Sequence, residues 1–108
     1  MSEQAIENEI VAVGKTAPRI TPSDIDAAIV AEQYHVFDGT TLTVCMLTLT
    51  NGFNVTGESA AASPSNFDPE IGRKIAKENA RNKIWALEGY LLKQRMYEAA
   101  PQRVQPND

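Results

Sequence analysis

The chain has 108 residues, of which 43% are hydrophobic and 22% charged, and carries a formal net charge of −4. This length predicts one domain with a small core, and the negative charge argues against a dedicated DNA-binding protein. A single cysteine, Cys45, excludes an internal disulfide and a cysteine-rich zinc site, and no apolar run approaches the ~20 residues of a membrane span, so we expect a cytosolic protein without a signal peptide or a membrane partner.

Residues 1–19 do not predict one structure. Residues 4–13 are compatible with a short helix and residues 9–13 with a short strand, and Gly14 and Pro18 interrupt either element. We expect residues 1–19 to be a flexible arm that becomes ordered only against a partner. A single domain is expected over residues 20–100, with a disordered tail over residues 101–108.

Residues 20–32 predict a short helix that covers one edge or end of a sheet. Thr21 suits the N-cap, Pro22 the first helical position and Asp24 the acidic position of a capping box. The helix predicted here is therefore well marked at its start.

Residues 33–37 predict a strand. This strand contains the only histidine of the chain, His35. With no second histidine and no pair of acids nearby, a half-buried strand position is expected for His35 rather than a metal site or a catalytic triad.

Residues 41–50 and 53–59 predict two antiparallel strands joined at Asn51-Gly52, which is a strong hairpin signal. A two-residue turn and a three-residue loop over residues 50–52 would give opposite registers. We favour the three-residue loop with a left-handed glycine, because it makes one face of the sheet apolar. The pairs that this register brings together are Leu49 with Phe53, Leu47 with Val55, and Cys45 with Gly57.

Three apolar residues in the first half of the hairpin, Leu42, Val44 and Met46, have the opposite parity. Either a bulge intervenes or that end of the strand is covered on both faces. With the helix described next, these elements predict an α+β fold: a three-stranded antiparallel sheet, made of a β-hairpin plus one strand, with a short N-terminal helix and one long C-terminal helix.

Residues 68–99 predict one helix of about 30 residues, which would be ~45 Å long. Asp68 suits the N-cap, Pro69 the first helical position, and Pro101 ends the helix. A row of small residues in its first half would let another backbone approach closely, so this half is expected to lie on a sheet or on a second helix. The row consists of Gly72, Ala76 and Ala80.

In the C-terminal half of this helix, four large side chains fall outside one narrow apolar face. A hairpin and a short helix are too small to cover all of them, so we expect copies of the chain to share this surface in a homo-oligomer. In the alternative, these residues and the N-terminal segment cover one another within a monomer. The candidate interface residues are Trp85, Tyr90, Leu92 and Tyr97.

Charge is unevenly distributed along the chain. Residues 1–68 carry nine acids and two bases, which gives −7, whereas residues 69–108 carry five acids and eight bases, which gives +3. This asymmetry favours contacts between copies or, equally, ion pairs within one chain.

A candidate ligand site combines the small-residue loop over residues 57–67 with basic side chains on the following helix. Backbone N–H groups at a helix start attract anions, so if the ligand is a nucleotide, the loop and helix start would hold its phosphate and Phe67 or Trp85 would stack on its base. The alternatives are a tight connection for the loop and a solvated face for the bases. The candidate ligand-binding residues are Ser59, Ser63, Ser65, Asn66, Phe67, Arg73, Lys77 and Arg81.

Catalytic motifs are not apparent in the sequence. The serines and Cys45 have no histidine at a suggestive spacing, and phosphate-loop, dinucleotide and kinase signatures are missing. We therefore expect a protein that is not an enzyme and that needs no cofactor and no metal.

Three segments within residues 20–98 carry a resemblance to known proteins: ITPSDIDAAIVAEQYHVF, LTLTNGFNVTGESA and SPSNFDPEIGRKIAKENARNKIWALEGYLLKQR. They resemble a family of small phage proteins known as gp-forty-nine-like or gp-sixty-six-like. The resemblance implies a phage or prophage origin, and together with the cytosolic expectation above it predicts a location in the host cytoplasm. It brings no activity and no site residues.

The sequence leaves three functions open. The first is a non-enzymatic accessory protein for host takeover or counter-defence that inhibits a host protein or sequesters a nucleotide signal as a homo-oligomer. The second is a weak nucleic-acid-binding protein that uses the basic helix face, although nucleic acid is the less expected partner. The third is a structural or assembly component of the virion.

Overall fold

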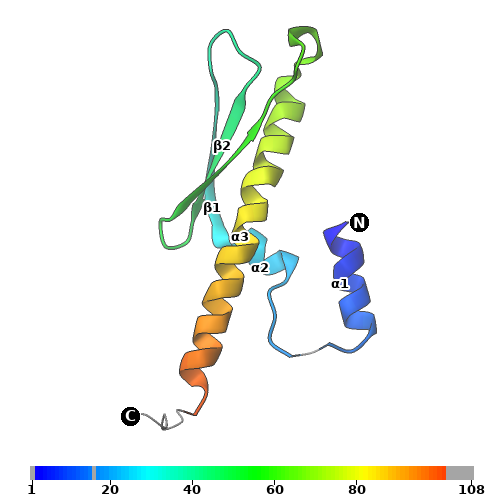
Figure 1. Ribbon diagram of the computed structural model, residues 1–108, viewed down its shortest axis with the longest axis vertical. Helices are drawn as coiled ribbons and strands as arrows, with labels where there is room; N and C mark the ends of the chain where they lie inside the picture. The colour runs from blue at the N-terminus through cyan, green and yellow to red at the C-terminus, as the bar shows by residue number, and fades with distance from the viewer. Residues whose placement is uncertain (1, 16, 102–108) are drawn as a thin grey trace, which may run out of the picture.

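The computed structural model of the chain describes residues 2–15 and 17–101 and confirms the α+β fold (Figure 1). The residues 102–108 of the predicted tail lie outside the described residues. A short 3₁₀ turn, Pro64–Asn66, precedes the last helix. The elements in chain order are α1 (Glu3–Ala12), α2 (Pro22–Ala28), β1 (Ile29–Val36), β2 (Thr43–Leu49), β3 (Asn54–Ser59) and α3 (Pro69–Ala99).

The sheet is an antiparallel meander with strand order β1-β2-β3, and its hairpin has the predicted register. Leu47 pairs with Val55 and Cys45 pairs with Gly57. The N–H of Leu49 donates to the carbonyl of Phe53 at 2.8 Å, which closes the three-residue loop. Its glycine, Gly52, has a φ of +90°, the left-handed conformation that this loop requires.

The apolar residues that alternate out of phase in the first half of β2 do not require a bulge in the hairpin. Residues of β2 alternate regularly between buried and half-buried, and β2 pairs with β3 without interruption. Val44 and Met46 lie on the outer face, half-buried because β2 is the central strand with neighbours on both sides. The one register irregularity in this sheet falls in β1, between Ile29 and Ala31.

The boundary between α2 and β1 differs from the prediction, because the helix predicted over residues 20–32 ends at Ala28. Its start is as predicted: Thr21 Oγ1 accepts from the N–H of Asp24, and Asp24 Oδ2 accepts from the N–H of Thr21. After Ala28 the β-branched Ile29 pairs with β2, so tertiary pairing outweighs the helical spacing of the apolar residues.

His35 was expected to be half-buried, and this prediction is wrong. His35 lies on the outer face of the edge strand β1, where no described element covers it, and its side chain is exposed. Its ring meets the ring of Phe37 edge to face with centroids 4.5 Å apart.

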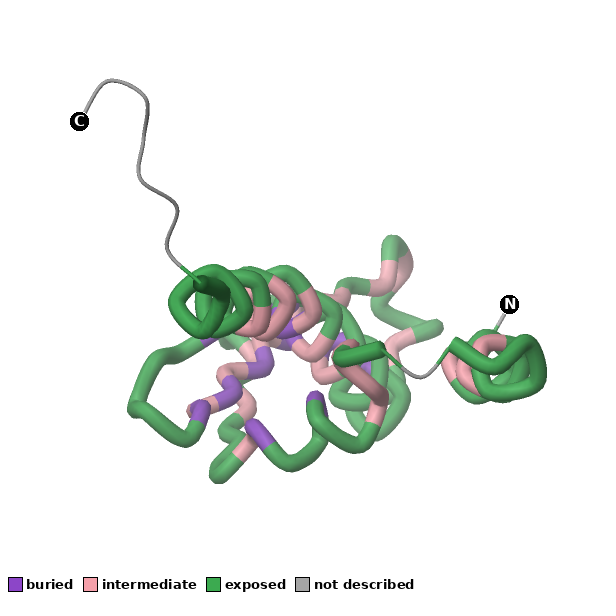
Figure 2. Tube along the Cα trace, turned by 90° about the horizontal axis from the view of Figure 1, so that it is seen from below, coloured by how far each residue is buried: buried purple, intermediate pink, exposed green. Residues whose placement is uncertain are grey.

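Helix α3 packs across the inner face of the sheet over β2 and β3, and the core lies between these two layers (Figure 2). The small-residue row makes the contact, as predicted. A Cβ atom added to Gly57 of β3 would lie 2.2 Å from the backbone N of Ala80 and 2.4 Å from the carbonyl O of Ala76. Helix and strand backbones therefore touch at this point, which fixes how close α3 sits to the sheet.

Thr43 is the one buried polar side chain of the described core, and its hydroxyl has no hydrogen-bond partner among the described residues. It faces Gly72 at the start of α3. A buried hydroxyl without a partner costs free energy relative to a methyl group of the same shape. We expect Thr43→Val to raise the free energy of unfolding by about 1 kcal/mol in urea titrations, whereas Thr43→Ser, which keeps the hydroxyl and leaves a void, should lower it.

The C-terminal half of α3 extends beyond the sheet (Figure 1). The sheet therefore does not cover all the apolar side chains of this half. The extents of the molecule, 63 × 37 × 24 Å, reflect this projection. Tyr90 is 73% exposed, Leu91 38% and Tyr97 65%. The prediction that a hairpin and a short helix are too small for this helix agrees with these exposures.

Candidate functional site

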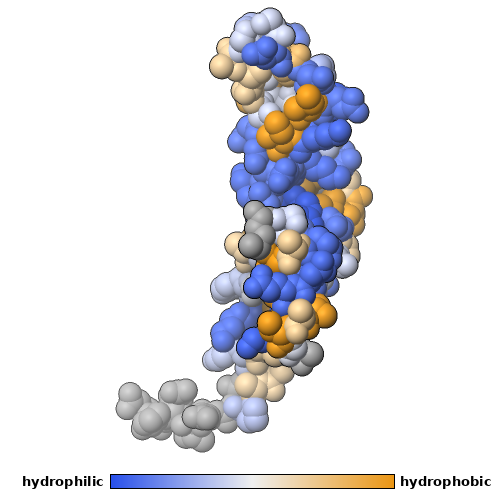
Figure 3. All heavy atoms as spheres, turned by 90° about the vertical axis from the view of Figure 1, so that its right-hand side faces the viewer, coloured by the Kyte–Doolittle hydropathy of each residue, from blue (hydrophilic) through white to orange (hydrophobic). Residues whose placement is uncertain are grey.

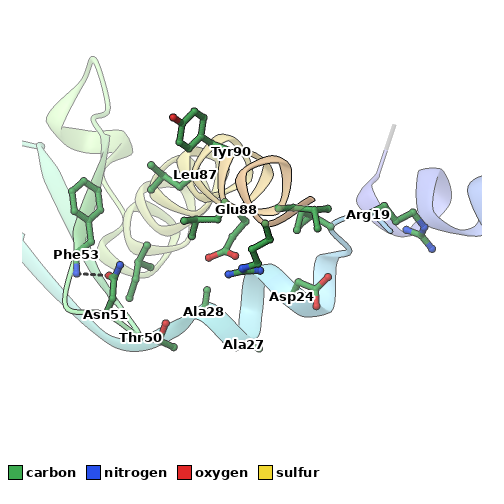
Figure 4. Close-up of a pocket in the computed structure, with 15 residues that line it drawn as sticks. Arg19, Asp24, Ala27, Ala28, Thr50, Asn51, Phe53, Leu87, Glu88 and Tyr90 are labelled. Atoms are coloured by element: carbon green, nitrogen blue, oxygen red, sulfur yellow. Dashed lines mark hydrogen bonds between the residues drawn. The ribbon is translucent and has the colours of Figure 1, made fainter. Parts of the chain in front are cut away.

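A groove of about 800 Å³ lies beside the projecting half of α3 and is here called the α3 groove. Figure 4 shows Phe53 and Asn51 of the hairpin turn on one side, Ala27 and Ala28 of α2 along another, and side chains of α3 above them. Three elements distant in sequence thus form its walls. The residues that line it are Arg19, Ile20, Asp24, Ala27, Ala28, Leu49, Thr50, Asn51, Phe53, Leu87, Glu88, Tyr90, Leu91, Leu92 and Arg95.

The α3 groove has an apolar floor and a charged rim. The floor is the continuation of the core-facing stripe of α3, which runs on from buried Ile84 to Leu87 and Leu91 beyond the last turn that the sheet covers. Two rim charges, Glu88 and Arg95, make no ion pair within the described chain. An apolar concavity with unpaired charges on its rim suits contact with another protein.

The four predicted interface residues do not share one environment. Tyr90 and Leu92 line the α3 groove, and Tyr97 lies exposed one heptad beyond Tyr90. Trp85 instead packs partly buried against the core, and its indole N–H donates to Glu3 Oε2 of α1 at 3.1 Å. The structure therefore gives Trp85 a partner within the chain.

Helix α1 adopts the helical alternative for residues 4–13 and stands apart from the two packed layers (Figures 1 and 2). None of its residues is buried. Polar contacts hold it: Arg19 donates to both carboxylate oxygens of Glu7 at 2.5 and 2.7 Å, and Arg81 pairs with Glu3. Figure 3 shows the side of the molecule on which α1 lies. Hydrophilic side chains predominate on this face, and the hydrophobic ones form separate patches.

Arg81 joins three segments of the chain. Its Nε donates to Asp26 of α2 at 2.9 Å, one terminal nitrogen pairs with Glu3 of α1, and the other donates to the carbonyl of Pro22 at 3.2 Å. The side chain is only 17% exposed. Sequence reasoning placed Arg81 in a ligand site and missed these acidic partners, because they lie 78 and 55 residues away in the chain.

The structure engages two of the three predicted basic residues, Lys77 and Arg81, in ion pairs with other elements. Arg81 lies 12 residues into α3, about 18 Å along its axis from the loop. Lys77 pairs with Glu32 of β1 at 2.7 Å. Arg73 is exposed and makes no ion pair in the part of the chain that the structure describes.

Hydrogen bonds among their own residues hold the loop before α3 and the first turn of that helix. Asp68 Oδ1 accepts from the N–H groups of Glu70 and Ile71, so a carboxylate already occupies the start of the helix. Such a negative group opposes a bound phosphate. The hydroxyls of Ser63 and Ser65 bond each other at 2.9 Å. Of the other loop candidates, Ser59 and Phe67 are half-buried and Asn66 is exposed.

The comparisons with known proteins give one result. A family model described as "Phage protein (N4 Gp49/phage Sf6 gene 66) family" matches residues 20–96. The chain belongs to this family of phage proteins. No curated protein and no solved structure matches it. The family model spans α2, the sheet and nearly all of α3, and so includes every element that lines the α3 groove.

We next consider metal ligands, membrane-spanning helices and reactive side chains within residues 2–15 and 17–101 of this gp49/gp66-family protein. No three His, Cys, Asp or Glu side chains gather there as metal ligands, and no helix there is long and apolar enough to cross a membrane. Burial raises the pKa of the Cys45 thiol, so its nucleophilic thiolate form is disfavoured. Burial also raises the pKa of Tyr34, on the same face, to about 12.

The attachment of α1 should depend on pH. Hydrogen bonds from Arg81 and Arg19 lower the pKa values of Glu3 and Glu7. A lowered pKa in the folded state means that the contribution to stability is complete above the ordinary glutamate value of about 4.3 and is lost as the pH falls through the lowered values. We expect the fluorescence of Trp85, the only tryptophan, to shift to longer wavelength below about pH 4 before the sheet unfolds. A single transition shared with far-ultraviolet circular dichroism would contradict this.

Proposed function

We propose that this phage protein is a non-enzymatic accessory factor of the host-takeover or counter-defence class, which acts by binding protein as a homo-oligomer. The observation that carries the proposal is the α3 groove, in which an apolar floor lies open to solvent beside a projecting helix. Contiguous apolar surface of this kind is typical of protein-binding sites. The inhibited target would be a host protein.

Nucleotide sequestration, the other form of this hypothesis, has less support. Lys77 and Arg81 are already paired with Glu32, Asp26 and Glu3, so their charge is offset within the chain. Two arginines line the α3 groove, but Arg19 is paired with Glu7, and among the described residues only Arg95 is left as a cation beside an aliphatic floor. For these reasons the proposal names protein as the ligand of the α3 groove.

The experiment compares tagged wild-type protein with Leu91→Glu, which places a carboxylate on the groove floor, and with Lys93→Glu, which places one outside the groove lining and makes an even larger change in net charge. A host protein captured from phage-infected cells is purified and titrated calorimetrically against each variant. The proposal predicts at least tenfold weaker binding, about 1.4 kcal/mol, for Leu91→Glu only. Equal affinities, or nucleotide binding that Arg73→Glu with Lys77→Glu abolishes, would contradict it.

A further inference from the structure

We propose that a second copy of this chain occupies the α3 groove, with the two α3 helices antiparallel about a two-fold axis beside Leu91. This inference rests on the proposed function, in which the groove binds protein, and it makes the second copy the occupant that a host protein would have to displace. In a two-fold interface the same patch serves both copies, so residue i contacts residue j and j contacts i. The patch must therefore be complementary to itself.

The two rim charges that α3 contributes satisfy this condition. Glu88 and Arg95 lie seven residues apart, two turns of helix, and so project from the same flank of α3. The midpoint between them falls between Leu91 and Leu92, in the middle of the helical stretch that lines the groove. In an antiparallel pair centred there, Glu88 of each copy meets Arg95 of the other, and a parallel pair would instead oppose like charges.

The apolar side chains around this centre supply the contact area. Tyr90 and Tyr97 also lie seven residues apart, on the other flank, and are 73% and 65% exposed. In two copies these tyrosines alone would contribute on the order of 500 Å² toward the roughly 1,200–2,000 Å² of a stable interface. Leu91, 38% exposed, lies at the centre.

The position of the helix end fits the same arrangement. α3 continues past Arg95, the last residue that lines the groove, and ends at Ala99. In the antiparallel pair this final turn runs along the partner's groove at the level of Leu87, where the hairpin and α2 form the walls. Each copy thereby covers the part of α3 that the other leaves exposed.

Charge reversal tests the pairing. The full-length chain is studied by sedimentation equilibrium, and Glu88→Arg, Arg95→Glu and the control Lys93→Glu are compared with the wild type. In a homodimer of either rim variant, like charges face each other at two places. Each reversal should therefore raise the dimer dissociation constant at least tenfold. Mixing the two reversed chains in equal amounts creates two opposite-charge pairs and should restore dimers close to wild-type affinity, as should the double variant Glu88→Arg/Arg95→Glu.

Several results would overturn the inference. One is a wild-type chain that stays monomeric at high concentration, and another is a dimer that neither rim reversal weakens. A third is a mixture of reversed chains that gains no affinity. If the wild-type chain is monomeric but Leu91→Glu still weakens binding of the captured host protein, the groove binds a host protein. In that case the further inference fails and the proposed function stands. If one rim variant fails to fold, the other reversal and Leu91→Glu decide the question.

Discussion

Replacing Gly57 with alanine is expected to lower the free energy of unfolding by about 3 kcal/mol or more, which is a large fraction of the 5–15 kcal/mol typical of a domain. The φ of Gly57 is not positive, so the backbone conformation itself would accept alanine. The new Cβ, however, would lie 2.2 Å from the N of Ala80 and 2.8 Å from its Cα. Backbone atoms cannot move aside as a flexible side chain can, so α3 must shift away from β3.

The matched control for this substitution is Gly89→Ala on the outer half of α3. A Cβ at Gly89 would meet no other atom within 4 Å. Glycine in a helix interior costs about 0.5–1 kcal/mol relative to alanine, so this change should stabilise the protein by that amount. Urea titrations followed by circular dichroism measure both variants. Opposite signs are predicted, and a Gly57→Ala variant as stable as the wild type would contradict the close backbone contact.

Replacing Arg81 with methionine is the second change with a large expected effect. It removes the group that joins Glu3, Asp26 and the carbonyl of Pro22. Breaking a buried ion pair costs about 3–5 kcal/mol, but Glu3 and Asp26 retain 35% and 67% exposure and can be rehydrated. We therefore expect a loss of about 1–2 kcal/mol, together with detachment of α1.

Amide hydrogen exchange of α1 and the fluorescence of Trp85 measure this detachment. The control is Lys77→Met, one turn earlier, which removes the pair with Glu32, in which both side chains are 42% exposed. An exposed pair contributes about 0.2–1 kcal/mol, so this control should have a small effect. If Arg81→Met leaves the exchange of α1 unchanged, other contacts hold that helix.

Much of the fold could be predicted because local chemistry and tertiary packing agree. The capping residues Thr21 and Asp68, together with Gly52 of the hairpin, fix element ends by their own hydrogen bonds or backbone angles. The small residues of α3 predicted a close contact, although the sequence did not show that Gly57 would be its partner. That pairing depends on the register of β3 against β2, which places Gly57 opposite Cys45.

The prediction for residues 29–32 failed because two tendencies compete there. The apolar spacing continues the helix, whereas β-branched Ile29 and Val30 favour a strand, and pairing with β2 decides between them. A helical period alone could not reveal this, since the partner residues in β2 lie 15 to 20 positions later in the chain.

The candidate site was predictable in part. The drift of the apolar stripe indicated uncovered surface on the C-terminal half of α3, and Tyr90 and Tyr97 are indeed exposed. The groove itself was not predictable, because Phe53 and Ala28 reach it from separate elements. The acidic partners of Arg81 were missed for the same reason, as ion pairs between distant segments leave no local pattern in the sequence.

The central claim is that copies of the chain share the uncovered half of α3, and hydroxyl-radical footprinting as a function of protein concentration tests it most directly. Tyr90 and Tyr97 should become protected as concentration rises, while Phe37 on the outer sheet face, 47% exposed, stays equally reactive. The Leu91→Glu variant should show no such protection. Tyrosines that remain as reactive in the concentrated wild-type protein as in this variant would contradict the claim.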